Sequence, residues 1–181
     1  MRKNLFFKDV KELTIGAMLV AMSVVMGIFC KTVLNFGGGL FRVTFENLPI
    51  IISGLLFGPI IGGLTGLTAD LISYLLSGQV YPLNLIVTLG SVTVGTLSGV
   101  VSRFIIRKRS PLQVIASGGL AHVVFSMIIK PIGLFAFYEW AVLWRIPLYL
   151  VIAPLEILLI CLLFKNNGIK RLLDGIDKEN K

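Results

Sequence analysis

The stretch LLFGPIIGG, residues 55–63, decides how this chain folds. It interrupts an apolar segment, residues 43–78, whose 36 residues would form one helix of about 54 Å, whereas the hydrocarbon core of a bilayer is only about 30 Å thick. Gly58 and Pro59 are a turn signal, and the residue before a proline is disfavoured in the helical region. The segment is therefore predicted to break into two short spans, residues 43–57 and 60–77.

The composition of the whole chain indicates a membrane protein. Of its 181 residues, 56% are hydrophobic and 14% are charged, and the mean hydropathy is +0.92. A soluble protein of this size lacks the interior volume to bury such apolar runs. The net charge of +8 would suit nucleic acid in a soluble protein. Here the basic residues lie in short clusters between apolar runs, so we expect no nucleic-acid partner.

Four further segments are apolar and long enough to cross a bilayer: residues 13–32, 83–106, 111–129 and 146–164. With six spans in all, thirteen of the 17 Lys and Arg residues fall on one side of the membrane. The positive-inside rule makes that side the cytoplasm. We therefore predict one all-α integral membrane domain over residues 1–181, with six transmembrane helices and both termini cytoplasmic.

Besides Glu139 in the last loop, six polar residues lie on the opposite, outer side, at or near the ends of spans: Lys31, Arg42, Glu46, Asn84, Lys130 and Arg145. Charged groups close to the bilayer usually pair with one another or line a wet cavity. We therefore treat this set as a candidate binding site. For Lys31 and Arg42, extension of the side chain to lipid headgroups is an equally good interpretation.

Lys130 and Arg145 bracket residues 131–144, a segment that we expect to be too short to cross the membrane. It is rich in aromatic residues, among them Trp140 and Trp144. Composition favours an interfacial aromatic belt, which needs no ligand. The alternative is a lid or wall whose rings stack on a flat heterocycle while the nearby cations attract carboxylates.

Three polar residues lie deeper in the spans. Asp70 is the only carboxylate that we expect near the middle of the bilayer, either as a helix contact satisfied by Ser or Thr or as an acceptor for a substrate. Glu156 lies about three turns beyond Arg145, which predicts a helix contact near the cytoplasmic side. His122 is predicted to be buried and hydrogen-bonded, since no second His or paired Cys supports a metal site.

The sequence does not indicate an enzyme. Ser117 and His122 lie on different faces of their helix, and no nucleophile turn surrounds the serine. No phosphate-binding loop is present, so this chain is expected to hold no cofactor and to leave any use of ATP to a partner.

Small residues recur at intervals of four, which lets helices approach closely in lipid. Packing within the monomer explains most of them: Gly54, Gly58, Gly62, Gly66, Gly95 and Gly99. Ala17 and Ala21 differ, because they lie near the cytoplasmic face, where a partner protein can dock.

Four stretches of the sequence resemble the substrate-binding S components of energy-coupling factor (ECF) vitamin transporters, most closely the folate branch: KELTIGAMLVAMSVV (11–25), FENLPIIISGLLFGPIIGGLTGLTADLISYLL (45–76), YPLNLIVTLGSVTVG (81–95) and WRIPLYLVIAPLEILL (144–159). The similarity runs from about residue 11 to 164. The combination of Phe-x-x-Leu-Pro-Ile with Leu-Phe-Gly-Pro is fairly specific to these proteins, whereas Ala-x-x-x-Ala alone is weak.

The resemblance implies a six-helix protein of a bacterial plasma membrane that captures a vitamin from outside the cell. It also implies a transmembrane coupling protein (EcfT) and two cytoplasmic ATPases as partners, with Ala17 and Ala21 facing the coupling protein. The ligand would lie near the outer surface, around residues 31–46, Asn84 and the Trp144–Arg145 corner.

Folate is the expected ligand because it combines a flat pterin with an anionic glutamate tail. Glu46 or Asp70 would accept hydrogen bonds from the pterin edge, and the glycines of NFGGGLF (35–41) suggest a loop that closes over it. The alternatives are another vitamin (riboflavin, thiamine or pantothenate) or a self-sufficient secondary transporter. The shortage of buried carboxylates argues against the transporter.

Overall fold

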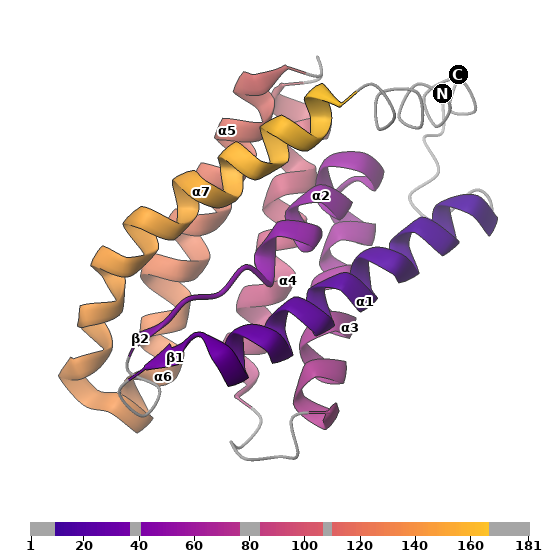
Figure 1. The fold of residues 1–181 in the computed structure, drawn as a ribbon. Coiled ribbons are helices and arrows are strands. Elements are labelled where there is room, and N and C mark those ends of the chain that lie inside the picture. Colours follow the sequence, from indigo (N-terminus) through magenta and orange to yellow (C-terminus); the bar gives the residue numbers. More distant parts are fainter. Residues whose placement is uncertain (1–9, 37–40, 77–83, 107–109, 167–181) are drawn as a thin grey trace.

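The computed structural model describes residues 10–36, 41–76, 84–106 and 110–166, which form a bundle of helices with one very short β-hairpin (Figure 1). The elements follow in this order: α1 (Val10–Val33), β1 (Asn35–Phe36), β2 (Phe41–Arg42), α2 (Asn47–Phe57), α3 (Pro59–Leu76), α4 (Leu85–Val100), η1 (Val101–Ile105), α5 (Pro111–His122), η2 (Val123–Ile129), α6 (Lys130–Tyr138), η3 (Glu139–Trp144) and α7 (Arg145–Lys165). The segments η1 and η2 are π-helical, and η3 is a 3-10 helix.

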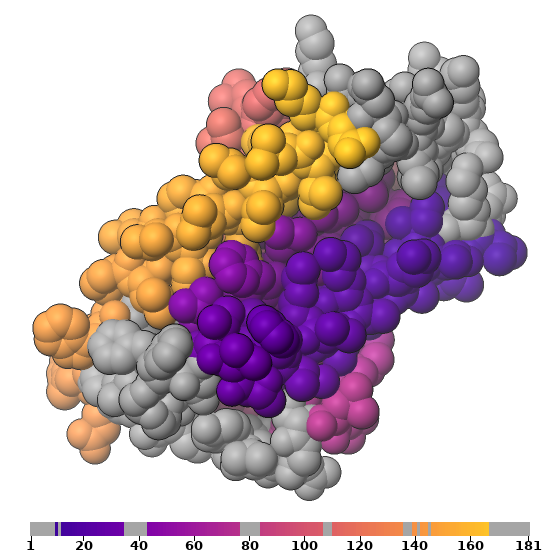
Figure 2. All heavy atoms as spheres, viewed as in Figure 1, coloured from indigo at the N-terminus to yellow at the C-terminus, as the bar shows by residue number. Residues whose placement is uncertain are grey.

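Within the described residues, five helical stretches are long and apolar enough to cross a membrane: Glu12–Val33, Pro59–Leu76, Leu85–Ile105, Pro111–Phe135 and Val142–Lys165. The all-helical membrane fold predicted from the sequence is thereby confirmed. Side chains of α1 and α7 cover much of one face of the bundle (Figure 2). The large apolar residues exposed along these two helices, such as Met18 and Leu158, are suited to contact with lipid.

Helix α2 is shorter than the predicted span of residues 43–57. It has 11 residues and a length of about 16 Å, and it begins only at Asn47. The start follows from Pro49, because a proline fits the first turn of a helix but not its interior. All of its residues except Leu56 are buried, with α1, α3, α4, α5 and α7 around it. Its apolar composition therefore reflects enclosure by protein.

The predicted break at Gly58 and Pro59 is confirmed. Helix α2 ends at Phe57, α3 begins at Pro59, and Gly58 between them has φ = 94°. A residue with a side chain rarely adopts this φ, whereas glycine does so readily. The turn reverses the chain, so that α2 and α3 pack against each other and both pack against α4.

Glycines allow this close packing, as their spacing predicts. A Cβ atom on Gly62 would overlap the carbonyl oxygen of Gly95 in α4, and one on Gly99 would overlap the backbone of Gly58 and Pro59. Such contacts are backbone against backbone, which only residues without a side chain permit. The glycine pattern therefore serves packing within the monomer.

The short hairpin marks one end of the molecule, which we call the hairpin end. Its strands pair antiparallel, with Asn35 opposite Arg42 and Phe36 opposite Phe41. The start of α1 and the end of α7 lie at the opposite end of the bundle (Figure 1). The extended residues that follow β2 lead from the hairpin end into the middle of the bundle, where α2 begins.

The expectation that residues 131–144 form an outer segment too short to span was partly wrong. Helix α5 continues through η2 into α6, so the helical stretch does not stop before Pro131 but reaches Tyr138. The π-helical turns of η2 shift the hydrogen-bond register just before Pro131. Such a shift lets a membrane helix accommodate a proline. Only η3 then separates this stretch from α7.

Candidate functional site

Lys130 and Glu46 form a buried ion pair at the centre of the predicted site. The Lys130 Nζ atom donates a hydrogen bond to Glu46 Oε1 over 3.4 Å, with side chains that are 6% and 21% exposed. Eighty-four positions separate the two residues in the sequence. Lys130 opens α6, about 12 Å below its end at the hairpin side, and Glu46 directly precedes α2. The fold thus brings two predicted site residues together.

Two aromatic rings surround the ammonium group of Lys130. Its Nζ atom lies 5.1 Å from the ring centroid of Phe125 and 5.4 Å from that of Tyr149. Phe125 belongs to η2, and the backbone N–H of Lys130 donates to its carbonyl oxygen. The π-helical register therefore places the ring of Phe125 below Lys130. Cation–π contacts of this kind stabilise a charge that burial has removed from water.

The carboxylate of Glu46 lies where α1, α2 and α3 meet. A Cβ atom on Gly27 in α1 would come within 3.0 Å of Glu46 Oε2 and 3.5 Å of Ser73 Oγ, so the absence of a side chain at Gly27 makes room for this carboxylate. Ser23 donates a hydrogen bond of 2.7 Å to the backbone carbonyl of Glu46. Glu46 also stands at the N-terminus of α2, whose positive dipole end favours a negative charge.

Asp70 belongs to the same polar cluster. Its Oδ2 atom accepts a hydrogen bond of 2.7 Å from Thr88 Oγ1 in α4, which confirms the prediction of a helix contact satisfied by Ser or Thr. The charges of Glu46, Lys31 and Lys130 all act on Asp70. Lys31, on the last turn of α1, is half-buried. Lys31, Glu46, Asp70 and Lys130 therefore form one connected electrostatic group, which we call the outer cluster.

Asn84 has a structural role in the fold. It caps the N-terminus of α4, where its Oδ1 atom accepts hydrogen bonds from the backbone N–H groups of Ile86 and Val87. Its Nδ2 atom donates to the carbonyl oxygen of Gly133 in α6. This amide therefore ties α4 to α6 beside the outer cluster.

The aromatic side chains of η3 point away from the bundle. Trp140 and Trp144 are 72% and 68% exposed, whereas Val142 between them is 1% exposed. Phe135 and Trp140 meet edge to face, with centroids 5.5 Å apart. This exposure favours the interfacial belt over a wall of the site. The side chains of Arg42 and Arg145, also predicted for the site, lie outside the described part of the structure.

A second buried pair lies deeper in the bundle. His122 Nε2 and Glu156 Oε2 are 2.6 Å apart, and the side chains are 2% and 0% exposed. His122 Nδ1 lies 3.3 Å from Ser126 Oγ. The prediction of a buried, hydrogen-bonded His122 is confirmed. Glu156 does make a helix contact, as expected, but it stands near the middle of α7, eleven residues after Arg145 and nine before Lys165. Asp70 is thus not the only deep carboxylate.

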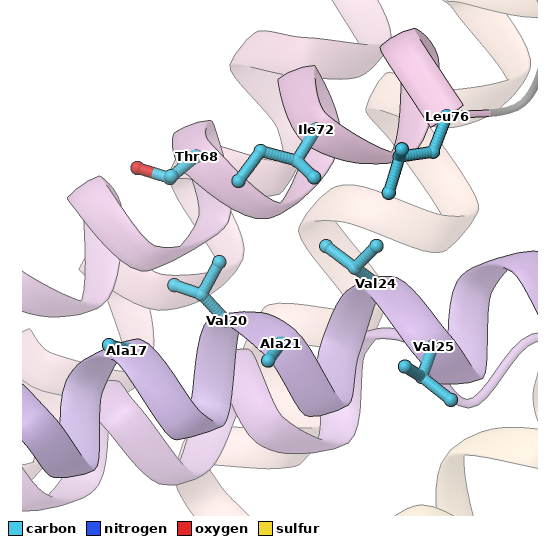
Figure 3. A pocket seen from close by; sticks show the side chains of 8 residues that line it. All are labelled: Ala17, Val20, Ala21, Val24, Val25, Thr68, Ile72 and Leu76. Carbon is cyan, nitrogen blue, oxygen red and sulfur yellow. The ribbon is translucent and has the colours of Figure 1, made fainter.

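Ala17 and Ala21 are exposed and line an apolar groove between α1 and α3, with a volume of about 470 Å³. Val20 and Val24 of α1 and Ile72 and Leu76 of α3 form its walls (Figure 3). The two alanines leave the backbone of α1 open to this side. Such a surface suits the close approach of another membrane helix.

Several residues of the site were missed by the sequence reasoning. Gly27, Phe125 and Tyr149 look like ordinary membrane-helix residues, and only their contacts with Glu46 and Lys130 distinguish them. The spacing of Lys130, Ser126 and His122 at intervals of four was a usable signal, because it places three polar groups on one helix face. Among the described residues, no group of three or more His, Cys, Asp or Glu side chains is placed to hold a metal.

Three comparisons with known proteins bear on the family and the fold. Residues 11–173 match the family described as "ECF transporter, substrate-specific component". The structure is similar to the crystal structure of FolT bound with folic acid, with a TM-score of 0.64 and 21% identity over 83% of this chain and 90% of that one. At this identity the likeness shows the fold alone.

A curated relative, the uncharacterized protein MG098 homolog of Mycoplasma pneumoniae, is 34% identical over 92 residues. The match covers 51% of this chain but only 18% of that protein. The region of similarity is therefore a small part of a much longer relative.

Proposed function

Because this chain belongs to the substrate-specific components of ECF transporters, we propose that it binds folate at its hairpin end and delivers it to an ATP-driven coupling module. The coupling module would consist of the transmembrane protein EcfT and two cytoplasmic ATPases. The ATPases would use the ATP, so the chain itself needs no cofactor. Family membership also argues against a self-sufficient secondary transporter.

The buried pair of Glu46 and Lys130 carries the folate assignment. An ionised carboxylate held at a helix N-terminus is a strong acceptor for two parallel N–H groups. The pterin ring of folate presents such donors, from its amino group and ring nitrogen. Asp70 offers a second acceptor in the same cluster. The structural neighbour that was crystallised with folic acid supports this ligand.

The cations of the outer cluster suit the other half of the ligand. Folate carries two carboxylates on its glutamate tail, and Lys31 and Lys130 supply positive charge in a region of low dielectric. We expect Arg42 and Arg145 to add to this attraction at the outer rim. Under the positive-inside rule, the proposed orientation has the hairpin end outside the cell and both termini in the cytoplasm.

The exposed groove of Ala17 and Ala21 supports the coupling half of the proposal. The groove extends along the middle of α1, residues 17–25, and the last turns of α3, residues 68–76, with Ala17 on its side nearer the cytoplasm in the proposed orientation. The groove is apolar and lies at the surface between these two helices. It is therefore suited to a transmembrane partner such as EcfT.

A thermal-shift screen of the purified protein against folic acid, riboflavin, thiamine and pantothenate tests the ligand. Folic acid at about 100 times its dissociation constant should add about 2.7 kcal/mol to the free energy of unfolding, and Glu46→Gln should reduce that gain. Glu139→Gln is the matched control, because Glu139 is exposed on η3. A shift with another vitamin and none with folic acid would contradict the folate assignment while leaving the family unaffected.

A further inference from the structure

The buried pair of His122 and Glu156 is not needed for capture of a ligand at the hairpin end. Both side chains are enclosed, at 2% and 0% exposure, and they join α5 to α7 near the middle of the bundle. An ionisable group at this depth is costly and usually has a function. A contact between two helices requires neither a carboxylate nor an imidazole, so this pair calls for an explanation of its own.

The geometry of the pair suits a proton. His122 Nε2 and Glu156 Oε2 lie 2.6 Å apart, which allows one proton to be held between them. His122 Nε2 and both carboxylate oxygens of Glu156 are buried without a hydrogen bond among the described residues, so a proton placed in the short contact between Nε2 and Oε2 would satisfy two of these three atoms. Ser126 Oγ, 3.3 Å from His122 Nδ1, accepts a hydrogen bond from the doubly protonated ring.

The pair is electrostatically connected to the outer cluster. His122 from α5, Glu46 from the start of α2 and Lys130 from α6 are titratable groups among the described residues whose charges reach Glu156. Lys130, Ser126 and His122 follow one another at intervals of four along one continuous helical stretch. On α7, Tyr149 contacts Lys130, and Glu156 lies two turns further along the same face. A change of charge near Lys130 therefore changes the electrostatic potential at the Glu156 carboxylate.

We propose that His122 and Glu156 form a proton-binding site linked to the ligand site, so that an anionic vitamin binds together with up to one proton. This inference rests on the proposed function, because it needs an anion at the outer cluster. A negative charge brought near Lys130 offsets the attraction that this lysine exerts on the Glu156 carboxylate, and the pair then holds a further proton more tightly. Linkage requires the converse: the affinity for the anion falls as pH rises, by at most about tenfold per pH unit.

Isothermal titration of the purified full chain with folic acid, at one pH in buffers of low and high ionisation enthalpy, measures the protons taken up. The wild-type protein should take up a measurable fraction of one proton per folic acid bound. Glu156→Gln removes the titrating group and keeps its shape, so it should bind folic acid with uptake lost. Glu139→Gln, an exposed glutamate on η3, should take up protons like the wild type.

Each result of this titration decides a different point. If the wild-type protein gives the same binding heat in both buffers, no proton is taken up. This result, or a release of protons, would overturn the linkage and leave folate binding intact. Unchanged uptake in Glu156→Gln would overturn the assignment to this pair. If Glu156→Gln does not fold, the pH dependence of the wild-type dissociation constant decides, and a constant value refutes the proposal. If folic acid neither produces heat nor shifts the melting temperature, the proposed ligand and its linkage both fail.

Discussion

In the outer cluster, single residues carry charges that are buried away from water, and other single residues compensate these charges. Lys130 is almost fully buried, and its charge is balanced by one carboxylate and two aromatic rings. Removing one partner of such a pair leaves the other charge without compensation, which costs more than the pair itself contributes. Gly27 has the opposite role, since its lack of a side chain leaves room for Glu46.

We predict that Glu46→Gln lowers the stability of the ligand-free protein by about 1 to 3 kcal/mol. This is below the cost of about 3 to 5 kcal/mol for breaking a fully buried pair, because Glu46 is 21% exposed. Adding Lys130→Met should recover part of the loss, since the unpaired charge is then gone. Melting curves of the two single variants and the double variant give the coupling. Additive losses would mean that the two charges do not interact.

Among the elements, α2 and α4 show how a short helix is held in a membrane protein. Helix α2 is half the length of a span, yet it is enclosed because α3 and α4 approach it through glycines. Close backbone approach replaces the hydrophobic driving force that lipid does not provide between helices. The π-helical segment η2 has a different effect, since it carries the helix past Pro131 and aligns Phe125 with Lys130.

Gly99→Ala should destabilise the protein by about 1 to 3 kcal/mol, because its Cβ atom would overlap the backbone of Gly58 and Pro59 and neither can move aside easily. Gly119→Ala on α5 is the matched control, since a Cβ atom there meets nothing within 4 Å. It should leave the melting temperature unchanged or raise it, as alanine favours helix. Equal losses in the two variants would show that the glycine contacts do not decide the packing.

In the whole molecule, the two candidate surfaces are formed by different side chains. The outer cluster consists of charged groups on α1, before α2, on α3 and on α6, whereas the groove is lined mainly by apolar side chains of α1 and α3 (Figure 3). A protein that binds a ligand with one surface and a coupling partner with the other can be altered at each surface separately. This separation gives the coupling proposal its test.

Ala17→Trp should abolish folate uptake in cells that carry the coupling module, because the indole fills the groove that the partner needs. Binding of folic acid by the purified variant should be unchanged. Met18→Trp is the matched control, since Met18 is exposed on the same helix and does not line the groove. If uptake by Ala17→Trp and Met18→Trp is equal, this groove is not the coupling surface.

The membrane class and the break at Gly58 and Pro59 follow from the amino-acid sequence alone. Both depend on local properties: the length of apolar runs, the conformational limits of glycine and proline, and the distribution of basic residues. For the candidate site residues, the same local properties predict only that they lie on one side of the membrane. They do not predict which of these residues contact one another.

Contacts between distant residues required the folded chain. Lys130 and Glu46, which are 84 positions apart in the sequence, form an ion pair. Asn84 caps a helix, and the side chains of Trp140 and Trp144 are exposed. Glu156 met His122 near the middle of the bundle, at a depth the sequence did not indicate. These outcomes depend on how each helix is rotated and tilted against its neighbours. Packing sets that rotation through side chains far apart in the chain, so no local pattern of residues specifies it.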